Sequence, residues 1–233
     1  MSITGRTILA CVNRVMRGER RRSRVVRYVR GAPGTYVWLA LLLVSTVAVH
    51  HMSPEFEREF LLERSTNIQR LSENPVRVLF ASALLIDGGN WLPYVALYSF
   101  IHAPAERWLG TLRWLVVCVT AHVLATLISE SAVLVAMWDG RAPSSTADTV
   151  DIGVSYALAG VVGVLVYRIA RPWRFGYLAV VLVVYGVPLV VGRTFTDFGH
   201  AVSLLIGFAC HPVTRGRGGV WDPRGAVASW RGW

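Results

Sequence analysis

The chain has 233 residues, of which 54% are hydrophobic and only 16% carry a charged side chain. Soluble domains contain about 25% charged residues, so this composition argues against a soluble protein and favours a membrane protein. All 24 basic residues are arginines, and the formal net charge is +10. A positive charge of this size can attract nucleic acid, but its position along the chain decides its role.

Six apolar segments follow one another along the chain, each close to the roughly 20 residues that a helix needs to cross the core of a bilayer. We therefore predict an all-α membrane protein in which residues 36–211 form a bundle of six transmembrane helices. The charged residues 53–77 are expected to form a water-exposed loop after the first helix. The six segments cover residues 36–52, 78–103, 112–129, 152–169, 173–192 and 195–210.

The arginines indicate how these segments are oriented. Residues 1–35, 104–113, 168–174 and 212–233 hold nine, two, three and four arginines respectively, and all four pieces share one side of the membrane. The positive-inside rule then places both termini in the cytoplasm and predicts a multi-pass protein of the cell membrane, inner or plasma. Because topology explains the charge, we expect the lipid bilayer rather than nucleic acid as its partner.

The two ends of the chain are expected to be cytoplasmic segments outside the bundle. Residues 1–35 form a basic segment that is either a tail fixing the topology or an amphipathic helix lying on an anionic inner leaflet. Residues 212–233 are expected to be a disordered cytoplasmic tail.

Cysteines and histidines give no sign of a disulfide framework or a metal site. Cys11, Cys118 and Cys210 are far apart and are interpreted as free thiols. No two of the six histidines show the i, i+4 spacing of a metal site, so we expect neither a metal nor another cofactor.

The predicted topology places a serine and a histidine at the same depth. The second, fourth and sixth segments run in the same direction, so their first turns share the outer half of the membrane. Ser155 lies about one turn into the fourth segment, and His200 lies one to two turns into the sixth. Asn90 and Tyr94 lie near the outer end of the second segment. Nucleophile, base and oxyanion donors are the groups that acyl transfer requires. His122, in the third segment, is interpreted as a packing histidine.

Two motifs around these residues resemble the rhomboid intramembrane proteases. "GVSYALAGVVG" resembles the G-x-S-G segment of that family and the glycines that follow it. Gly153, Ser155, Gly160 and Gly163 match this pattern. The resemblance implies that Ser155 is the nucleophile, that Gly153 supports the site, and that the later glycines are structural.

Further motifs extend the resemblance over residues 76 to about 210. "DFGHAVSLLIGF" is similar to the rhomboid A-H-x-x-G-x-x-x-G segment, with His200 on the catalytic histidine and Gly207 on the last glycine. "ERWLG" resembles the E-x-R-L-G that follows the second rhomboid helix, which gives Glu106 a structural role. The same register places Arg77 on the structural arginine of the family's W-R pair.

The chain departs from the family at four positions near the predicted site. Rhomboids carry H-x-x-x-N in the second helix, and Asn90 and Tyr94 stand at those two positions when counted back from "ERWLG" without gaps. Tyr156 replaces the glycine after the serine, and Ala159 stands where an aromatic ring often packs on the histidine. We expect these changes to crowd the serine and to loosen the histidine.

Two functions remain open at this point. In the first, Ser155 and His200 hydrolyse a transmembrane helix of another membrane protein, while Asn90 and the Ser155 backbone N–H stabilise the oxyanion. In the second, the protein is a non-catalytic member of the same fold that binds membrane helices, because small residues repeat along the fourth and sixth segments in any case. Solute transport has less support, because the chain lacks a paired internal repeat.

Overall fold

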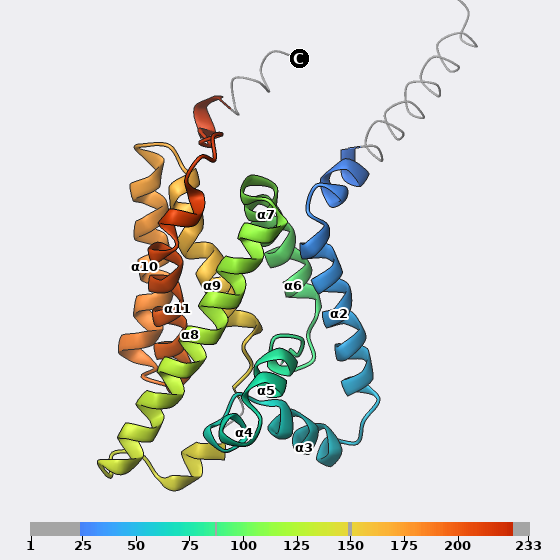
Figure 1. The fold of residues 1–233 in the computed structure, drawn as a ribbon, viewed down its shortest axis with the longest axis vertical. Helices are drawn as coiled ribbons and strands as arrows, with labels where there is room; N and C mark the ends of the chain where they lie inside the picture. The colour runs from blue at the N-terminus through green and yellow to red at the C-terminus, as the bar shows by residue number, and fades with distance from the viewer. Residues whose placement is uncertain (1–23, 87, 149–150, 226–233) are drawn as a thin grey trace, which may run out of the picture.

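The computed structural model describes residues 24–86, 88–148 and 151–225. Within these ranges the fold is all-helical, as predicted, with one isolated β-bridge between Ile169 and Trp221. Among the described helices, three are long and apolar enough to cross a membrane: α2 (Pro33–His50), α8 (Thr111–Trp138) and α10 (Trp173–Val191). Two shorter apolar helices, α9 (Val154–Leu165) and α11 (Phe195–Ala209), complete the central bundle (Figure 1).

A broken helical rod lies beside α2 and replaces the predicted second span of residues 78–103. It consists of α6 (Leu92–Leu97), the π-helical turn η1 (Tyr98–His102) and α7 (Ala103–Leu109). Pro104, just after the π-turn, has no N–H to give to the preceding turn, which accounts for the widened backbone there. Gly110 then turns the chain into α8 with a φ of 84°, a conformation that favours glycine.

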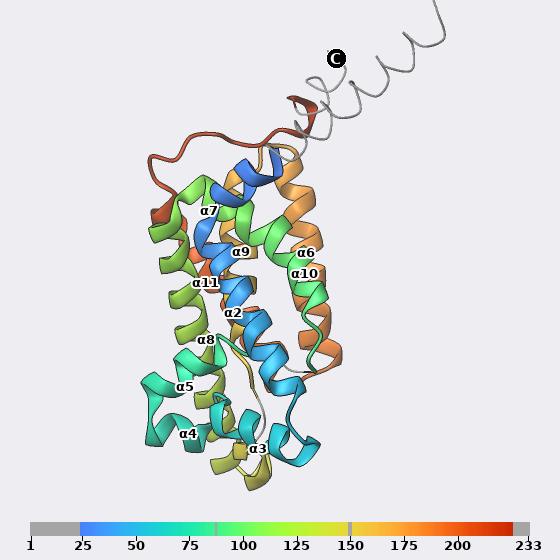
Figure 2. The same ribbon diagram turned by 90° about the vertical axis from the view of Figure 1, so that its right-hand side faces the viewer.

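Three short helices form a layer at one end of the bundle, which we call the cap: α3 (Pro54–Arg64), α4 (Ile68–Glu73) and α5 (Pro75–Ser82). The ends of the described chain lie at the opposite end, which we call the tail end (Figures 1 and 2). Residues 53–77, predicted to form a water-exposed loop, are mostly exposed but helical, and Leu61, Ser65 and Thr66 are buried in the cap. The predicted span beginning at residue 78 was wrong, because α5 belongs to the cap.

The centre of the bundle is α9, which packs between α8 and α11 and has nearly every residue buried. Twelve residues at about 1.5 Å each span roughly 18 Å, well short of the roughly 30 Å hydrocarbon core. The first turn of α9 therefore lies inside the bundle, between the cap and the tail end. Non-helical backbone is tolerated at that depth because protein rather than lipid surrounds it.

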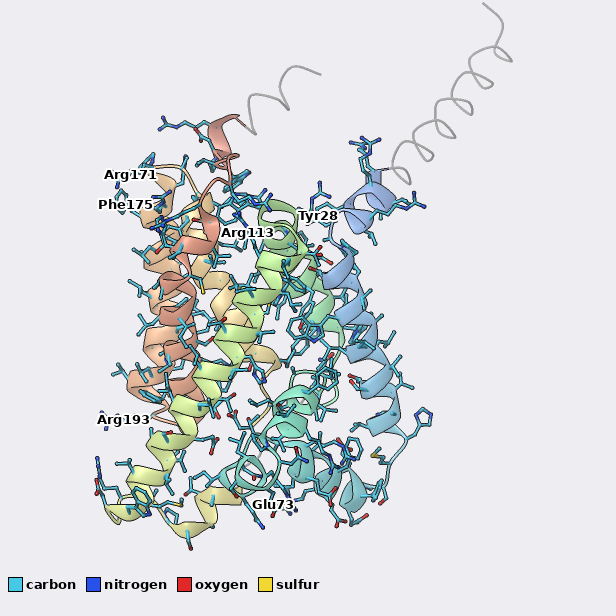
Figure 3. The ribbon with its side chains drawn as sticks, viewed as in Figure 1. Tyr28, Glu73, Arg113, Arg171, Phe175 and Arg193 are labelled. Carbon is cyan, nitrogen blue, oxygen red and sulfur yellow. The ribbon has the colours of Figure 1, made fainter. Side chains whose placement is uncertain are left out.

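The outer surface of the bundle at α10 is apolar, and its side chains point away from the rest of the protein. In α10 only Val181 is buried, whereas Val180, Val183, Val187 and Val191 are all more than half exposed. An exposed apolar surface of this extent is suited to lipid rather than water. Charged side chains lie at the two ends instead: Arg113 and Arg171 at the tail end, Glu73 and Arg193 at the other (Figure 3).

The C-terminal tail forms local structure within the described residues, which extend to residue 225. The short helix η4 (His211–Thr214) is followed by backbone hydrogen bonds that pair Trp221 with Arg168 and Ala170. Arg113 on α8 donates to two carbonyl oxygens of the same stretch. Disorder of residues 212–233 stays a prediction, and residues 226–233 lie outside the described residues. Most of the basic segment 1–35 lies outside the described residues.

Candidate active site

The structure brings Ser155 and His200 together. Ser155 is the second residue of α9 and His200 is in the second turn of α11, and the serine Oγ lies 2.8 Å from the histidine Nε2. The same hydroxyl is 3.4 Å from the Ile152 carbonyl oxygen, a longer and weaker alternative. Both side chains are only partly buried. The pair thus has the geometry of a nucleophile and its general base, within reach of a reactant.

Glycines set the distance between the two helices that carry the pair. A Cβ added to Gly163 would lie 2.5 Å from the Leu204 carbonyl oxygen, and one added to Gly207 would overlap the backbone at Gly160. A Cβ on Gly160 would in turn overlap Ala121 on α8. The three predicted structural glycines therefore lie where α8, α9 and α11 approach most closely.

Gly153 precedes the serine and packs on a histidine from α8. A Cβ at Gly153 would overlap the His122 ring, so the close fit requires glycine. His122 is buried, and its Nε2 lies 2.9 Å from the Leu79 carbonyl oxygen and 3.5 Å from the Ser82 Oγ in α5. His122 is therefore a packing residue, as predicted. Its second role, joining the loop before Ser155 to the cap, was not apparent from the sequence.

The predicted oxyanion donors lie near the cap end of the broken rod. Asn90 is exposed in the coil before α6. Of the hydrogen bonds found for the Ser155 side chain in the described residues, one goes to His200 and one to Ile152, and neither goes to Asn90. Tyr94 is half-buried in the first turn of α6 and packs against the cluster that contains Ile152. Their roles as oxyanion donors remain predictions.

Backbone donors are better placed at this position. The first N–H groups of an α-helix have no acceptor within the helix, and the helix dipole adds a partial positive charge there. Ser155 is the second residue of α9, so its own N–H is of this kind. This arrangement favours negative charge developing beside the serine.

Glu106 is a structural residue at the tail end. Its buried carboxylate accepts hydrogen bonds from the backbone N–H groups of Gly34 and Thr35, and from the hydroxyls of Thr35 and Thr111. One side chain thus caps the start of α2 and ties it to the start of α8. Arg77 has an exposed side chain, and its backbone N–H donates to Asn74 at the start of α5. A structural role for the Arg77 side chain stays a prediction.

Tyr156 lies against the histidine and is held there by Asp151, an acid that the sequence did not single out. The Tyr156 ring contacts the His200 ring edge to face with 5.1 Å between centroids, and Tyr185 of α10 lies 6.3 Å away. The ring that packs on the histidine therefore comes from Tyr156 rather than from position 159, and the expected loosening of the histidine stays a prediction. Tyr156 does not separate Ser155 from His200, and its hydroxyl donates to Asp151 at 2.7 Å. The sequence signal was present in "DIGVSY", where an acid precedes the tyrosine by five residues.

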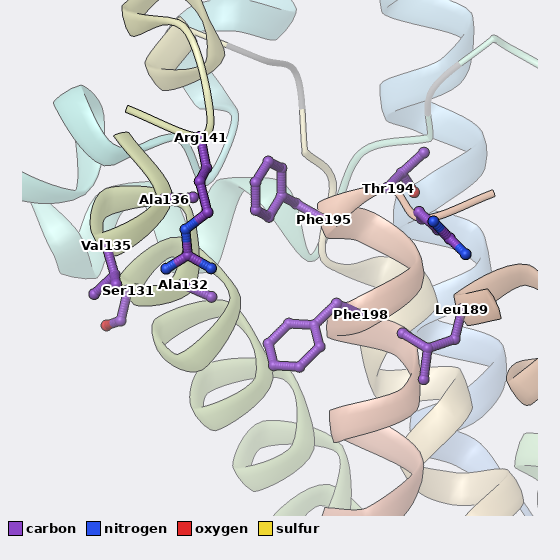
Figure 4. A pocket seen from close by; sticks show the side chains of 10 residues that line it. Ser131, Ala132, Val135, Ala136, Arg141, Leu189, Thr194, Phe195 and Phe198 are labelled. Atoms are coloured by element: carbon purple, nitrogen blue, oxygen red, sulfur yellow. The ribbon is translucent and has the colours of Figure 1, made fainter. Parts of the chain in front are cut away.

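Asp197 and a groove in the bundle surface also lie near the Ser155–His200 pair, but they are not part of it. Asp197 forms a capping box with Thr194 at the start of α11 and so stabilises that helix rather than contacting the imidazole. A groove of about 560 Å³ opens between α8, α10 and α11, with Arg141 and Phe198 on its walls (Figure 4). Neither Ser155 nor His200 lines it. Among the described residues, no three histidine, cysteine or acidic side chains cluster as metal ligands.

Together, the fold and the site define an all-helical membrane protein with a Ser–His pair inside its bundle. A family model described as rhomboid-like protein matches residues 27–220. The chain therefore belongs to the rhomboid-like family. No curated protein and no solved structure matched it.

Proposed function

We propose that this protein is an intramembrane serine protease that crosses the cell membrane six times, with both termini in the cytoplasm. The single observation that carries the catalytic part is the 2.8 Å contact between the Ser155 Oγ and the His200 Nε2. The orientation is supported by the arginines of the sequence, 18 of which fall in residues 1–35, 104–113, 168–174 and 212–233, and by Arg113 and Arg171 at the tail end in Figure 3.

The reaction follows from the geometry. With its ring proton on Nδ1, His200 accepts the Ser155 hydroxyl proton at Nε2 as the oxygen attacks a peptide carbonyl carbon. The resulting oxyanion is stabilised by the Ser155 backbone N–H at the start of α9. The imidazolium then gives its proton to the leaving amine, and water hydrolyses the acyl-enzyme by the same sequence of proton transfers.

The substrate proposed is a transmembrane helix of another integral membrane protein. Ser155 lies in the first turn of α9, between the cap and the tail end. A helical peptide bond must unwind before a serine can attack its carbonyl, so helices weakened by glycine or proline are the preferred targets.

The test is labelling of purified protein in detergent with a fluorophosphonate, which reacts with activated serines. We expect Ser155→Ala and His200→Ala to lower the labelling rate by a factor of about 10³ or more. Ser131→Ala is the matched control, because Ser131 is an exposed helical serine whose hydroxyl bonds only within α8. Equal labelling of all four proteins would overturn the proposal.

A non-catalytic helix-binding function is the second candidate, and the exposed position of Asn90 favours it. Loss of an oxyanion donor typically slows acyl transfer by about 10²- to 10³-fold. Incubation of the protein with single-span helices in proteoliposomes distinguishes the two. Cleavage that requires Ser155 supports the protease, whereas capture of helices that is unchanged in Ser155→Ala, without cleavage, supports the binding protein.

A further inference from the structure

Tyr156 is held at three points around the histidine that it touches. Its hydroxyl donates to the Asp151 carboxylate, and its backbone carbonyl accepts a hydrogen bond from the buried Ser203, one turn after His200. A Cβ on Gly199 would lie 2.5 Å from the tyrosine oxygen, so α11 leaves a space shaped for this ring. Tyr156 is fully buried as a result.

Asp151 is itself fixed by the cap. Its backbone N–H donates to the Ser65 Oγ, and its carbonyl oxygen accepts from the Ser65 hydroxyl and from both the N–H and the hydroxyl of Thr66. These residues form the junction between α3 and α4. A continuous set of contacts therefore runs from the cap through Asp151 and Tyr156 to His200.

The histidine needs such support because it lacks the usual third group of a catalytic triad. Of the hydrogen bonds found in the described residues, the one to Ser155 is the only one to the His200 ring. An imidazole without a carboxylate partner depends on packing for its orientation. An edge-to-face aromatic contact contributes about 0.5–1.5 kcal/mol and depends on ring orientation.

We propose that Tyr156, anchored by Asp151 to the α3–α4 junction, is a positioning residue that holds His200 Nε2 on Ser155. This inference rests on the proposed protease function. Tyr156, the residue next to the nucleophile, then orients His200, because Ala159 has no ring that could pack on the histidine. It also makes the cap part of the active site's support.

The first test measures the labelling rate of the folded fraction in five variants. Tyr156→Leu removes the ring and is expected to slow labelling about 10- to 100-fold, since a misplaced catalytic group costs up to about 10². Tyr156→Phe keeps the ring and restores most of the rate. Asp151→Ala is expected to label at the same rate as Tyr156→Phe. The double variant Asp151→Ala with Tyr156→Phe is no slower than either single variant, because all three remove the same hydrogen bond. Asp151→Asn keeps an acceptor and labels nearly as the wild type does.

The matched control is Tyr177→Leu. The Tyr177 hydroxyl donates to the Val162 carbonyl at 2.7 Å, so this tyrosine also packs against α9, but it makes no contact with the ring of His200 in the described structure. Tyr177→Leu is expected to lower stability without slowing labelling of the folded fraction. If Tyr156→Leu behaves in the same way, the positioning role is overturned while the protease proposal stands.

A second measurement does not require activity. The ¹⁵N NMR signals of the His200 ring, identified by their loss in His200→Ala, report its orientation and proton position directly. We expect Tyr156→Leu to shift or broaden these signals and Tyr177→Leu to leave them in place. Unchanged signals in Tyr156→Leu overturn the proposal, even if the wild type is not labelled and the protease function fails.

Discussion

The two halves of the molecule each set a histidine against aromatic rings, but only His200 faces a partly exposed hydroxyl, whereas His102 lies beside the buried Cys118 thiol, whose Sγ is 3.9 Å from the His102 Nδ1. His102, toward the tail end, is fully buried, stacks on Tyr98 with 4.2 Å between centroids, and accepts a hydrogen bond from the Trp114 indole at 3.1 Å. His200, toward the cap, is partly exposed and faces the Ser155 hydroxyl. Aromatic surroundings thus orient both rings, and exposure together with the partner decides which of them has a chemical role.

The backbone explains why His102 is buried. The π-turn η1 directs it into the bundle, where Trp38 and Trp114 pack against its ring.

The largest expected effect separates these two histidines. His200→Ala should lower fluorophosphonate labelling by about 10³-fold or more, because the base is lost. His102→Phe should leave labelling of the folded fraction within about threefold of the wild type. It should nevertheless cost about 1–3 kcal/mol of stability, because the buried Trp114 N–H loses its acceptor. Labelling and thermal unfolding, measured on the same samples, check both statements. A slowed His102→Phe would mean that the two halves are coupled.

The next effect concerns the anchor of the tail end. Glu106→Ala removes the acceptor of hydrogen bonds from the starts of α2 and α8. Charge-assisted hydrogen bonds contribute about 1.5–3 kcal/mol each when a buried partner is left unsatisfied, so a loss of about 3 kcal/mol or more is expected. Glu106→Gln keeps an acceptor and should lose less. Thermal unfolding in detergent measures the difference, and equal losses in the two variants would show that only side-chain volume matters.

A smaller effect tests whether helix approach or helix propensity governs the centre. Gly163→Ala places a Cβ against the backbone of α11 and should cost about 1–3 kcal/mol by overpacking. Gly186→Ala on the outer face of α10 meets nothing within 4 Å and should stabilise by up to about 1 kcal/mol. Chemical unfolding of both variants gives the two signs. Two changes of the same sign would contradict the close packing of α9 on α11.

The pairing of Ser155 with His200 could be predicted because both helices carry their signals locally. Each residue opens a segment of small side chains, and the direction of each segment follows from the order of the spans. Gly160, Gly163 and Gly207 belong to the same local pattern, and so their place at the helix contact was also predictable.

The broken helical rod of α6, η1 and α7 could not be aligned with the family's second helix in this way. Counting back from Glu106 without gaps assumes a regular helix, but η1 inserts a π-turn at Tyr98–His102 and the helix begins only at Leu92. One additional residue in a turn rotates every earlier side chain by about 100°. Asn90 therefore lies before the helix rather than within it.

The support behind His200 was also beyond the sequence. Asp151 contacts Ser65 and Thr66, which are separated from it by 86 and 85 positions. No local periodicity relates a cap junction to a residue so distant along the chain. Helix α5 of the cap was also missed in the sequence. The apolar stretch that begins at residue 78 has the same pattern whether it crosses the bundle or covers its end.

The smallest effect is the dependence of stability on pH at the cap. Burial raises the pKa of Asp151, although the hydrogen bonds from Tyr156 and Thr66 act in the opposite direction. Because the folded pKa lies above the unfolded one, the protein is most stable below the unfolded value. That stability is lost as the pH rises through the folded pKa, at up to about 1.4 kcal/mol per pH unit. Asp151→Asn cannot titrate and should flatten this part of the curve. Thermal unfolding from about pH 4 to about pH 8 measures it. Two outcomes would contradict this prediction: a wild-type stability that rises over this pH range, or a stability curve that is the same in Asp151→Asn. Either result would mean that Asp151 is not the dominant titrating group.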